Sequence, residues 1–344
     1  MSVLLDEEIR SQPDVLAGLI AQEGARVRRI VADLPPFAYA LIAARGTSDH
    51  AATYAKYAWA ALTGHPVALA TPALHTLYRT PPRLDEALVV GISQSGQSPD
   101  IVAVVEEGKR QGRPTLAITN DGSSPLAAAA DHVIELHAGV ERSVAATKTY
   151  TAQLATIALL AAAWHGQPER WTELERMPDV LSAVLGGVDD LAQQAERYRY
   201  MEHCVLIGRG YNYATALELA LKLKELTYVM ANAYSSADFR HGPIATIADG
   251  MPVLLIMPQG AVFSDMLQLA QDLQMQGAEL LVASDVAEAQ ALATTVLPLP
   301  PAVPEWLSPI AAIVPGQVLA MNLARAKGVD PDRPRGLQKV TRTV

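Results

Sequence analysis

The strongest constraint on the fold is an internal repeat, in which segments about 164 residues apart correspond in order. The matching segments are Arg45-Gly46 with Arg209-Gly210, LVVGISQSG (88–96) with VLLIMPQGA (253–261), TLAITN (115–120) with LLVASD (280–285), HVIEL (132–136) with TVLPL (295–299), and Gln153 with Gln317. Any two α/β units share a rhythm of strand, turn and helix, but five matches at a nearly constant offset favour a duplicated domain. The sequence therefore predicts two related halves.

Short apolar runs rich in β-branched residues predict the architecture of each half. Each run is followed by a turn containing Gly or Ser and then by a helical stretch, as in α/β proteins with parallel sheets. The clearest runs are 40–44, 87–92, 114–119, 203–207 and 252–257. In such sheets ligands bind at the carboxyl ends of the strands, so the loops that follow these runs are where functional residues are expected.

The length of 344 residues suits two domains of ordinary size. We expect an N-terminal helical segment over 1–35, a first domain over 36–185 and a second domain over 195–344, with a linker near Gly186-Gly187. The most apolar helix, Ala152 to Trp164, is shorter than the ~20 residues that span a bilayer, which predicts a buried core helix.

Charge and cysteine content exclude several classes of protein. The net charge is −9 and no cluster of Lys and Arg is present, which argues against a nucleic-acid surface. Cys204 is the only cysteine, so an intramolecular disulfide or a zinc site of several cysteines is excluded. The N-terminus, MSVLLDEEIR, is acidic where a signal peptide is basic. We expect a cytoplasmic protein with no nucleic-acid or membrane partner.

The loop SQSGQSPD (93–100) is the strongest candidate for a binding site. It follows an apolar run and precedes a helical stretch, with Ser98 as the expected N-cap and Pro99 as the first helical residue. Its hydroxyls, its glycine and the free N–H groups of a helix N-terminus would form a neutral cradle for a phosphate. A plain capped turn would look similar, but the matching loop, 258–261, lacks the hydroxyls. One phosphate site is predicted, with further hydroxyls from Thr47 and Ser48.

Ionisable residues in the second half suggest acid–base chemistry less strongly. Glu218, Lys222 and Glu225 stand at positions i, i+4 and i+7 of a predicted helix, which places them on one face. On the pattern alone, a solvated stripe with a weak ion pair is the simpler interpretation. His241 lies in a polar loop and Lys339 in the C-terminal tail, and each alone is more often structural than catalytic.

Five segments taken together resemble the sugar isomerase (SIS) domains of glucosamine-6-phosphate synthase and of relatives that have no glutaminase domain. The segments are RGTS, SQSGQS, ALELALKLKE, FRHGP and PRGLQKVTRTV. The resemblance covers nearly the whole chain in matching order. It implies an α/β fold of two tandem doubly wound SIS domains, each a parallel sheet flanked by helices. It also implies a homodimer whose active sites are shared between subunits.

The resemblance further implies roles for individual residues. Glu225 would carry a proton between C1 and C2 of the sugar, His241 would assist ring opening, and Lys339 would approach the C2 carbonyl or imine. Glu218 and Lys222 would orient hydroxyls and tune Glu225. Groups that would bind a hexose 6-phosphate are Thr47, Ser48, Ser93, Gln94, Ser95, Ser98 and, through its backbone, Val144.

The expected reaction converts glucosamine 6-phosphate and water to fructose 6-phosphate and ammonia, without a metal or cofactor. The synthase has an N-terminal glutaminase domain with a cysteine after the initiator Met, whereas this chain begins Met1-Ser2, which favours release of ammonia over its fixation. A fructosamine-6-phosphate deglycase and a plain hexose-phosphate isomerase are alternatives within enzymes. A non-catalytic sugar-phosphate sensor is the alternative of another class, although the N-terminal segment is short and acidic for a helix-turn-helix.

Overall fold

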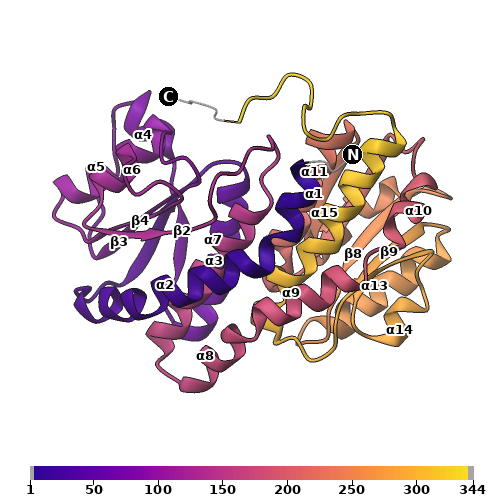
Figure 1. The fold of residues 1–344 in the computed structure, drawn as a ribbon, viewed down its shortest axis with the longest axis horizontal. Coiled ribbons are helices and arrows are strands. Elements are labelled where there is room, and N and C mark those ends of the chain that lie inside the picture. The colour runs from indigo at the N-terminus through magenta and orange to yellow at the C-terminus, as the bar shows by residue number, and fades with distance from the viewer. Residues whose placement is uncertain (1–3, 340–344) are drawn as a thin grey trace. The chain divides into compact units, whose positions relative to one another are not determined.

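The computed structural model describes residues 4–339, which fall into two compact units, each built around one sheet (Figure 1). Of the described residues, the first-sheet unit comprises 14–141, 148–175 and 338–339. The second-sheet unit comprises 4–13, 142–147 and 176–337. The predicted division into 1–35, 36–185 and 195–344 stays a prediction, although the first of these ranges is helical, with α1 (Leu4–Arg10) and α2 (Gln12–Asp33).

The first-sheet unit contains a five-stranded sheet in which all strands are parallel, in the order β2-β1-β3-β4-β5. Its strands are β1 (Tyr39–Ala43), β2 (Val67–Leu69), β3 (Ala87–Ser93), β4 (Thr115–Thr119) and β5 (His132–Glu135). The helices that follow the strands or close the unit are α3 (Thr47–Thr63), α4 (Pro72–Thr76), α5 (Pro99–Arg110), α6 (Pro125–Ala129), α7 (Lys148–His165) and α8 (Pro168–Glu175).

The second-sheet unit repeats this topology, with the strand order β7-β6-β8-β9-β10. Its strands are β6 (His203–Gly208), β7 (Met230–Ser235), β8 (Pro252–Ile256), β9 (Glu279–Ser284) and β10 (Thr295–Pro298). Its helices after α1 are α9 (Met177–Gly186), α10 (Leu191–Glu196), α11 (Tyr213–Thr227), α12 (Ser236–Arg240), α13 (Phe263–Met275), α14 (Ala287–Gln290) and α15 (Ser308–Ala326). Both the α/β class and the expected pair of parallel sheets are confirmed.

Each predicted apolar run forms a strand. Apolar runs predict these strands well because the sheets are buried on both faces. In the second sheet, Val253 and Leu255 pack on α13, whereas Leu254 lies near residues of α11 and α15. The sequence did not predict β2 and β7. Most of their residues are only half-buried or exposed, so neither strand forms an apolar run.

Two long apolar helices form the cores of the units. The predicted helix Ala152 to Trp164 lies within α7, in which residues 148–162 are all buried, so its assignment as a core helix is confirmed. Among the described residues, Glu305–Ala326 is long and apolar enough to cross a membrane by length and composition. However, 94% of its most apolar window is buried in the structure, as in a core helix.

The strand order places the loops of interest. In an order of the type 2-1-3-4-5, the chain turns in opposite directions after the two central strands, which opens a crevice at their carboxyl ends. In the first sheet these strands are β1 and β3, followed by the loops that contain Thr47 and Ser93. In the second sheet they are β6 and β8.

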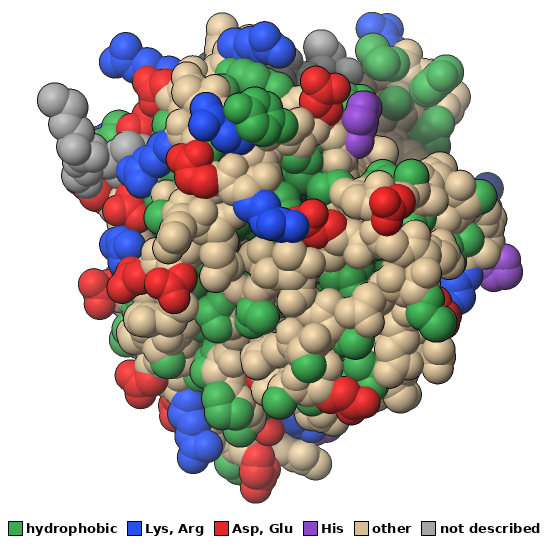
Figure 2. Space-filling view, turned by 90° about the vertical axis from the view of Figure 1, so that its right-hand side faces the viewer, with side chains coloured by type: hydrophobic (Ala, Val, Ile, Leu, Met, Phe, Trp, Pro, Cys, Tyr) green, Lys and Arg blue, Asp and Glu red, His purple; other side chains and the backbone are tan. Residues whose placement is uncertain are grey.

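On the face of the molecule drawn in Figure 2, charged side chains of both signs are interspersed with scattered hydrophobic ones.

Candidate active site

The loop after β3, which was predicted to bind phosphate, is held by hydrogen bonds between its own amides and serine hydroxyls. Ser93 Oγ accepts a hydrogen bond from Gly96 N at 3.1 Å, and Ser95 Oγ accepts one from Gln97 N at 3.3 Å. Gly96 has φ +61°, and a Cβ there would overlap the side chain of Ser124, so the position requires glycine. A hydroxyl that accepts from an amide keeps its own proton. Both serines can therefore still donate to an anion.

Ser98 is the N-cap of α5 and Pro99 is its first residue, as predicted. Its side chain nevertheless makes no capping hydrogen bond, although its backbone is extended at φ −74° and ψ 112°. Within the described part of the loop, the Ser98 hydroxyl is therefore not used by its own helix. This differs from an ordinary capped turn, in which that oxygen satisfies a helix N–H group.

The loop after β1 lies beside the loop after β3. Thr47 and Ser48 open α3, and the buried Ser48 Oγ accepts a hydrogen bond from Gln153 Nε2 at 3.0 Å. Arg45 Nε donates to Asp100 Oδ2 at 2.8 Å, which ties this loop to the first turn of α5. The fold thus brings the predicted phosphate ligands of the first-sheet unit to two neighbouring strand ends, with Gln94 half-buried between the serines.

The acid–base residues on α11 form a buried trio. Lys222 Nζ lies 3.3 Å from Glu218 Oε1 and 2.5 Å from Glu225 Oε2. The side chains of Lys222 and Glu218 are 1% and 0% exposed, whereas that of Glu225 is 20% exposed. The predicted placement on one face is confirmed, but the solvated-stripe interpretation is wrong. Only Glu225 is partly open.

The electrostatics of the trio keep the lysine charged. Burial alone would lower the pKa of Lys222, but the charges of Glu218 and Glu225 and hydrogen bonds to both carboxylates outweigh burial and raise it. Two carboxylates share this buried cation, and of the three side chains only that of Glu225 is partly exposed.

His241 lies at the C-terminal cap of the one-turn helix α12 and is exposed. The expectation that its imidazole is outside the core is confirmed. Its backbone N donates to Asp238 O at 3.1 Å, and the next residue, Gly242, has φ +132°, which favours glycine. Pro243 then begins a short 3₁₀ helix.

Lys339 is tied down rather than frayed. Its Nζ donates to Glu141 Oε2 at 2.6 Å, and this buried carboxylate also accepts the Thr149 hydroxyl at 2.8 Å. Both partners belong to the first-sheet unit. The rest of the predicted tail motif, 340–344, lies outside the described residues. Nothing in the sequence pointed to Glu141, because it stands in an ordinary polar stretch.

Val144 is half-buried in the segment 142–147 of the second-sheet unit. The backbone of this segment is held by Glu8, whose carboxylate accepts from Arg142 N at 2.5 Å and from Ser143 N at 3.3 Å. The buried Glu8 was not singled out from the sequence, because an acidic residue in an N-terminal helix is usually a solvated one.

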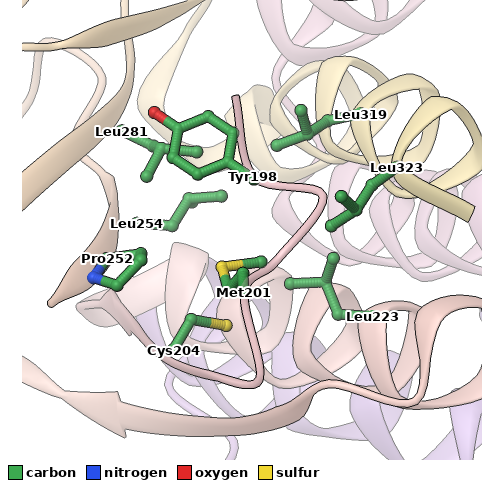
Figure 3. Close-up of a pocket in the computed structure, with 9 residues that line it drawn as sticks. All are labelled: Tyr198, Met201, Cys204, Leu223, Pro252, Leu254, Leu281, Leu319 and Leu323. Atoms are coloured by element: carbon green, nitrogen blue, oxygen red, sulfur yellow. The ribbon is translucent and has the colours of Figure 1, made fainter. Parts of the chain in front are cut away.

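A small cavity lies next to α11 in the second-sheet unit. It has a volume of about 10 Å³ and lies between strands of the second sheet and the helices α11 and α15 (Figure 3). Its lining residues are Tyr198, Met201, Cys204, Leu223, Pro252, Leu254, Leu281, Leu319 and Leu323. Burial raises the pKa of Cys204 to about 12, so the thiol stays protonated and is a poor nucleophile.

The fold and these side chains define a tandem doubly wound α/β protein with a serine-rich loop at a helix N-terminus in one unit and a buried Glu-Lys-Glu trio in the other. The chain belongs to the SIS domain family, whose model matches residues 39–163 and 199–308. The expected family is therefore confirmed.

Relatives indicate the kind of SIS protein. The chain is 34% identical over 343 residues to glutamine–fructose-6-phosphate aminotransferase (isomerizing) of Thermococcus kodakarensis, covering 97% of this chain and 57% of that protein. The chain thus spans little more than half the length of such relatives. The C-terminal domain of glucosamine-fructose-6-phosphate aminotransferase from Francisella tularensis has a similar structure, with a TM-score of 0.87, 27% identity and coverage of 97% and 99%.

A glucosamine-6-phosphate deaminase from Thermotoga maritima shares the fold, with a TM-score of 0.78 and coverage of 99% and 100%, at 21% identity. This likeness extends to the fold alone. The chain is thus an SIS-domain protein whose relatives include isomerizing aminotransferases.

Proposed function

We propose that the chain is an SIS-type phosphosugar isomerase of the deaminating kind, which converts glucosamine 6-phosphate and water to fructose 6-phosphate and ammonia. The observation that carries the proposal is the trio on α11, because a buried Lys222 fixes one oxygen of Glu225 while 20% of that side chain stays open. A carboxylate held in this way can take a proton from one carbon and return it to the next. The aminotransferase relatives are named for fructose 6-phosphate, which supports the substrate class.

In this proposal the loop 93–98 holds the 6-phosphate. The hydroxyls of Ser93, Ser95 and Ser98 donate to the phosphate oxygens, and the N-terminus of α5 adds a favourable dipole. The hydrogen bonds that Ser93 and Ser95 accept from loop amides orient their hydroxyls before the ligand arrives. Gln94 and the Thr47-Ser48 pair complete the polar lining.

The chemistry then proceeds in three steps. His241 assists opening of the sugar ring, and Glu225 removes the C2 proton to give an enolamine. Glu225 returns that proton to C1, which leaves an imine at C2. Water adds to the imine and ammonia leaves, so that the C2 carbonyl of fructose 6-phosphate remains. Glu218 stabilises Lys222, and Lys339, once released from Glu141, would approach C2.

The proposal includes a homodimer, with His241 serving the partner's site, and a cytoplasmic location. Both rest on the family resemblance. The exposure of His241 is compatible with a role toward a second subunit.

The test is an assay of ammonia and fructose 6-phosphate from glucosamine 6-phosphate. We expect Glu225→Gln to abolish turnover, a loss of at least about 10³-fold in kcat, and to leave sugar-phosphate affinity within about two-fold, since an amide cannot shuttle the proton. Exposed Glu288→Gln on α14 is the matched control and should keep full activity. Turnover retained in Glu225→Gln would refute the role of this carboxylate.

Other substrates separate the alternatives. Interconversion of fructose 6-phosphate and glucose 6-phosphate without ammonia release would identify a plain isomerase, and turnover of a fructosamine 6-phosphate would identify a deglycase. Binding of these compounds without turnover of any would identify a sensor.

A further inference from the structure

The one-turn helix that precedes His241 is bound at both ends by a single carboxylate. Ser236, the first residue of α12, donates through its hydroxyl to Asp265 Oδ2 at 2.7 Å. Arg240, the last residue, donates through Nη1 to Asp265 Oδ1 at 2.9 Å and through Nη2 to Asp265 O at 3.0 Å. Asp265 lies in the first turn of α13, so α12 is fastened to a longer helix.

Arg209 fastens the same cluster to the sheet. It directly follows β6, and its Nη1 donates to Ser236 Oγ at 3.0 Å and lies 3.3 Å from Asp265 Oδ2. Burial would raise the pKa of Asp265, but the hydrogen bond from Ser236 and the charges of Arg240 and Arg209 outweigh it and lower the pKa. The carboxylate is therefore ionised at neutral pH and can accept from all three side chains at once.

We call the contacts of Asp265 with Ser236, Arg240 and Arg209 the Asp265 clamp. This clamp is suited to orienting α12 rather than to stabilising the fold. The side chains of Asp265, Arg209 and Arg240 are between 31% and 38% exposed, and ion pairs at such exposure add little to the free energy of unfolding. A helix of five residues has no stability of its own. Its direction is therefore set by what binds its ends, together with Phe239, which is buried in the core.

We propose that Asp265 is a positioning residue for His241, acting through Ser236 and Arg240 to hold α12 and hence the imidazole that follows it. The backbone beyond His241 is constrained by Gly242 and Pro243, so the clamp supplies the remaining constraint on the N-terminal side. The inference rests on the proposed function, in which His241 assists ring opening. Asp265 itself does not touch the sugar.

The test compares a substrate that must be ring-opened with one that is always open. Fructose 6-phosphate closes its ring through the C5 hydroxyl, so 5-deoxyfructose 6-phosphate cannot form this ring. Removal of the C1 proton by Glu225 and its return from heavy water place deuterium at C1 of either compound, which NMR detects. Only the first compound needs His241 before this exchange.

We expect Asp265→Asn to lower the exchange rate of fructose 6-phosphate by about ten-fold and that of the 5-deoxy compound by less than about two-fold, because small displacements of a catalytic group are costly. The amide keeps one accepting oxygen but its nitrogen cannot accept, so the contact from either Ser236 or Arg240 is lost. Glu279→Gln, which removes a comparable ion pair with Arg197 elsewhere in the unit, is the matched control and should change neither rate. Arg240→Lys, which loses the two-pronged contact but keeps the charge, should reproduce the split if Asp265→Asn folds poorly.

The outcomes are distinct. Equal losses on the two compounds, or no loss on either, would overturn the positioning role while leaving the proposed function in place. Wild-type protein that exchanges the C1 proton of neither compound would overturn the proposed function and the inference with it.

Discussion

The two sheets have the same strand order, yet the amides of the loops after their third strands donate to different kinds of acceptor. In the first-sheet unit, the amides of Gly96 and Gln97 donate to serine hydroxyls, which are neutral and can pass a hydrogen bond on to a ligand. In the second-sheet unit, Gln259 N donates to Asp285 Oδ1 at 2.8 Å and Ala261 N donates to Glu305 Oε2 at 2.9 Å. The second loop already holds two carboxylates of its own chain, so a phosphate would be repelled.

The helices after the first strand of each sheet, α3 and α11, also differ, and here it is the second-sheet unit that carries the polar side chains. At the positions of α3 that match Glu218, Lys222 and Glu225 stand Tyr54, Ala58 and Ala61, which cannot transfer protons at neutral pH. Both Tyr54 and Ala58 are fully buried. One copy of the duplicated fold has thus kept neutral hydroxyls in a loop, and the other has placed charges inside a helix interface. The comparison teaches that the same topology carries different side chains in its two copies, so the proposed division into a binding loop and a reacting helix depends on side chains rather than on strand order.

The largest effect on stability is expected from Lys222→Met. The change leaves the buried Glu218 and Glu225 without their shared cation, which destabilises the fold by about 3–5 kcal/mol. Denaturant unfolding measures this loss. Lys56→Met on the exposed face of α3 is the matched control and should change the free energy of unfolding by less than about 0.5 kcal/mol. Similar values for the two variants would show that the trio is solvated after all.

The pH dependence provides a second measurement on the same variant. The pKa of Lys222 is raised in the folded state above its ordinary value of 10.5. Its stabilisation is therefore complete below pH 10.5 and is lost as the pH rises through the folded value. Above pH 10.5 the wild type should lose stability more steeply than Lys222→Met, and parallel curves would contradict the raised pKa.

A smaller effect, on binding, is expected from Ser95→Ala and Ser98→Ala. Each removes one hydroxyl that would donate to the phosphate, which should raise KM about ten-fold with kcat nearly unchanged, as loss of uniform binding does. Steady-state kinetics on glucosamine 6-phosphate measure both constants, with exposed Ser182→Ala as the control. A change in kcat alone would show that the loop does not act as a phosphate cradle.

The smallest effect is expected from Glu305→Ala in the loop of the other copy. The change removes the acceptor of Ala261 N and should lower the free energy of unfolding by about 1 kcal/mol, without altering KM. Thermal or denaturant unfolding and kinetics on the same preparation check both parts. A rise in KM as large as that of Ser95→Ala would mean that the two loops share the task of binding.

Much of the fold was predictable because its signals are local. Parallel strands buried on both faces must be apolar runs, and a duplicated topology repeats them at a constant offset, so the two sheets and the serine-rich loop at the start of α5 could be inferred from residue order. The edge strands β2 and β7 were missed because few of their residues are buried. Ser98 was placed correctly at the helix start, whereas the lack of a capping hydrogen bond from its side chain depends on side-chain geometry.

The sequence by itself determined the fold class, the repeat, the family and the residues that could do chemistry. Only the tertiary structure decided that the stripe on α11 is buried, because the periodicity of charges does not say which face of a helix is covered. It also decided that Asp265 holds α12 at both ends and that Glu305 accepts a hydrogen bond from Ala261 N in the loop after β8. These contacts join residues 25 to 44 positions apart, and sequence patterns within one helix or strand carry no information at that range.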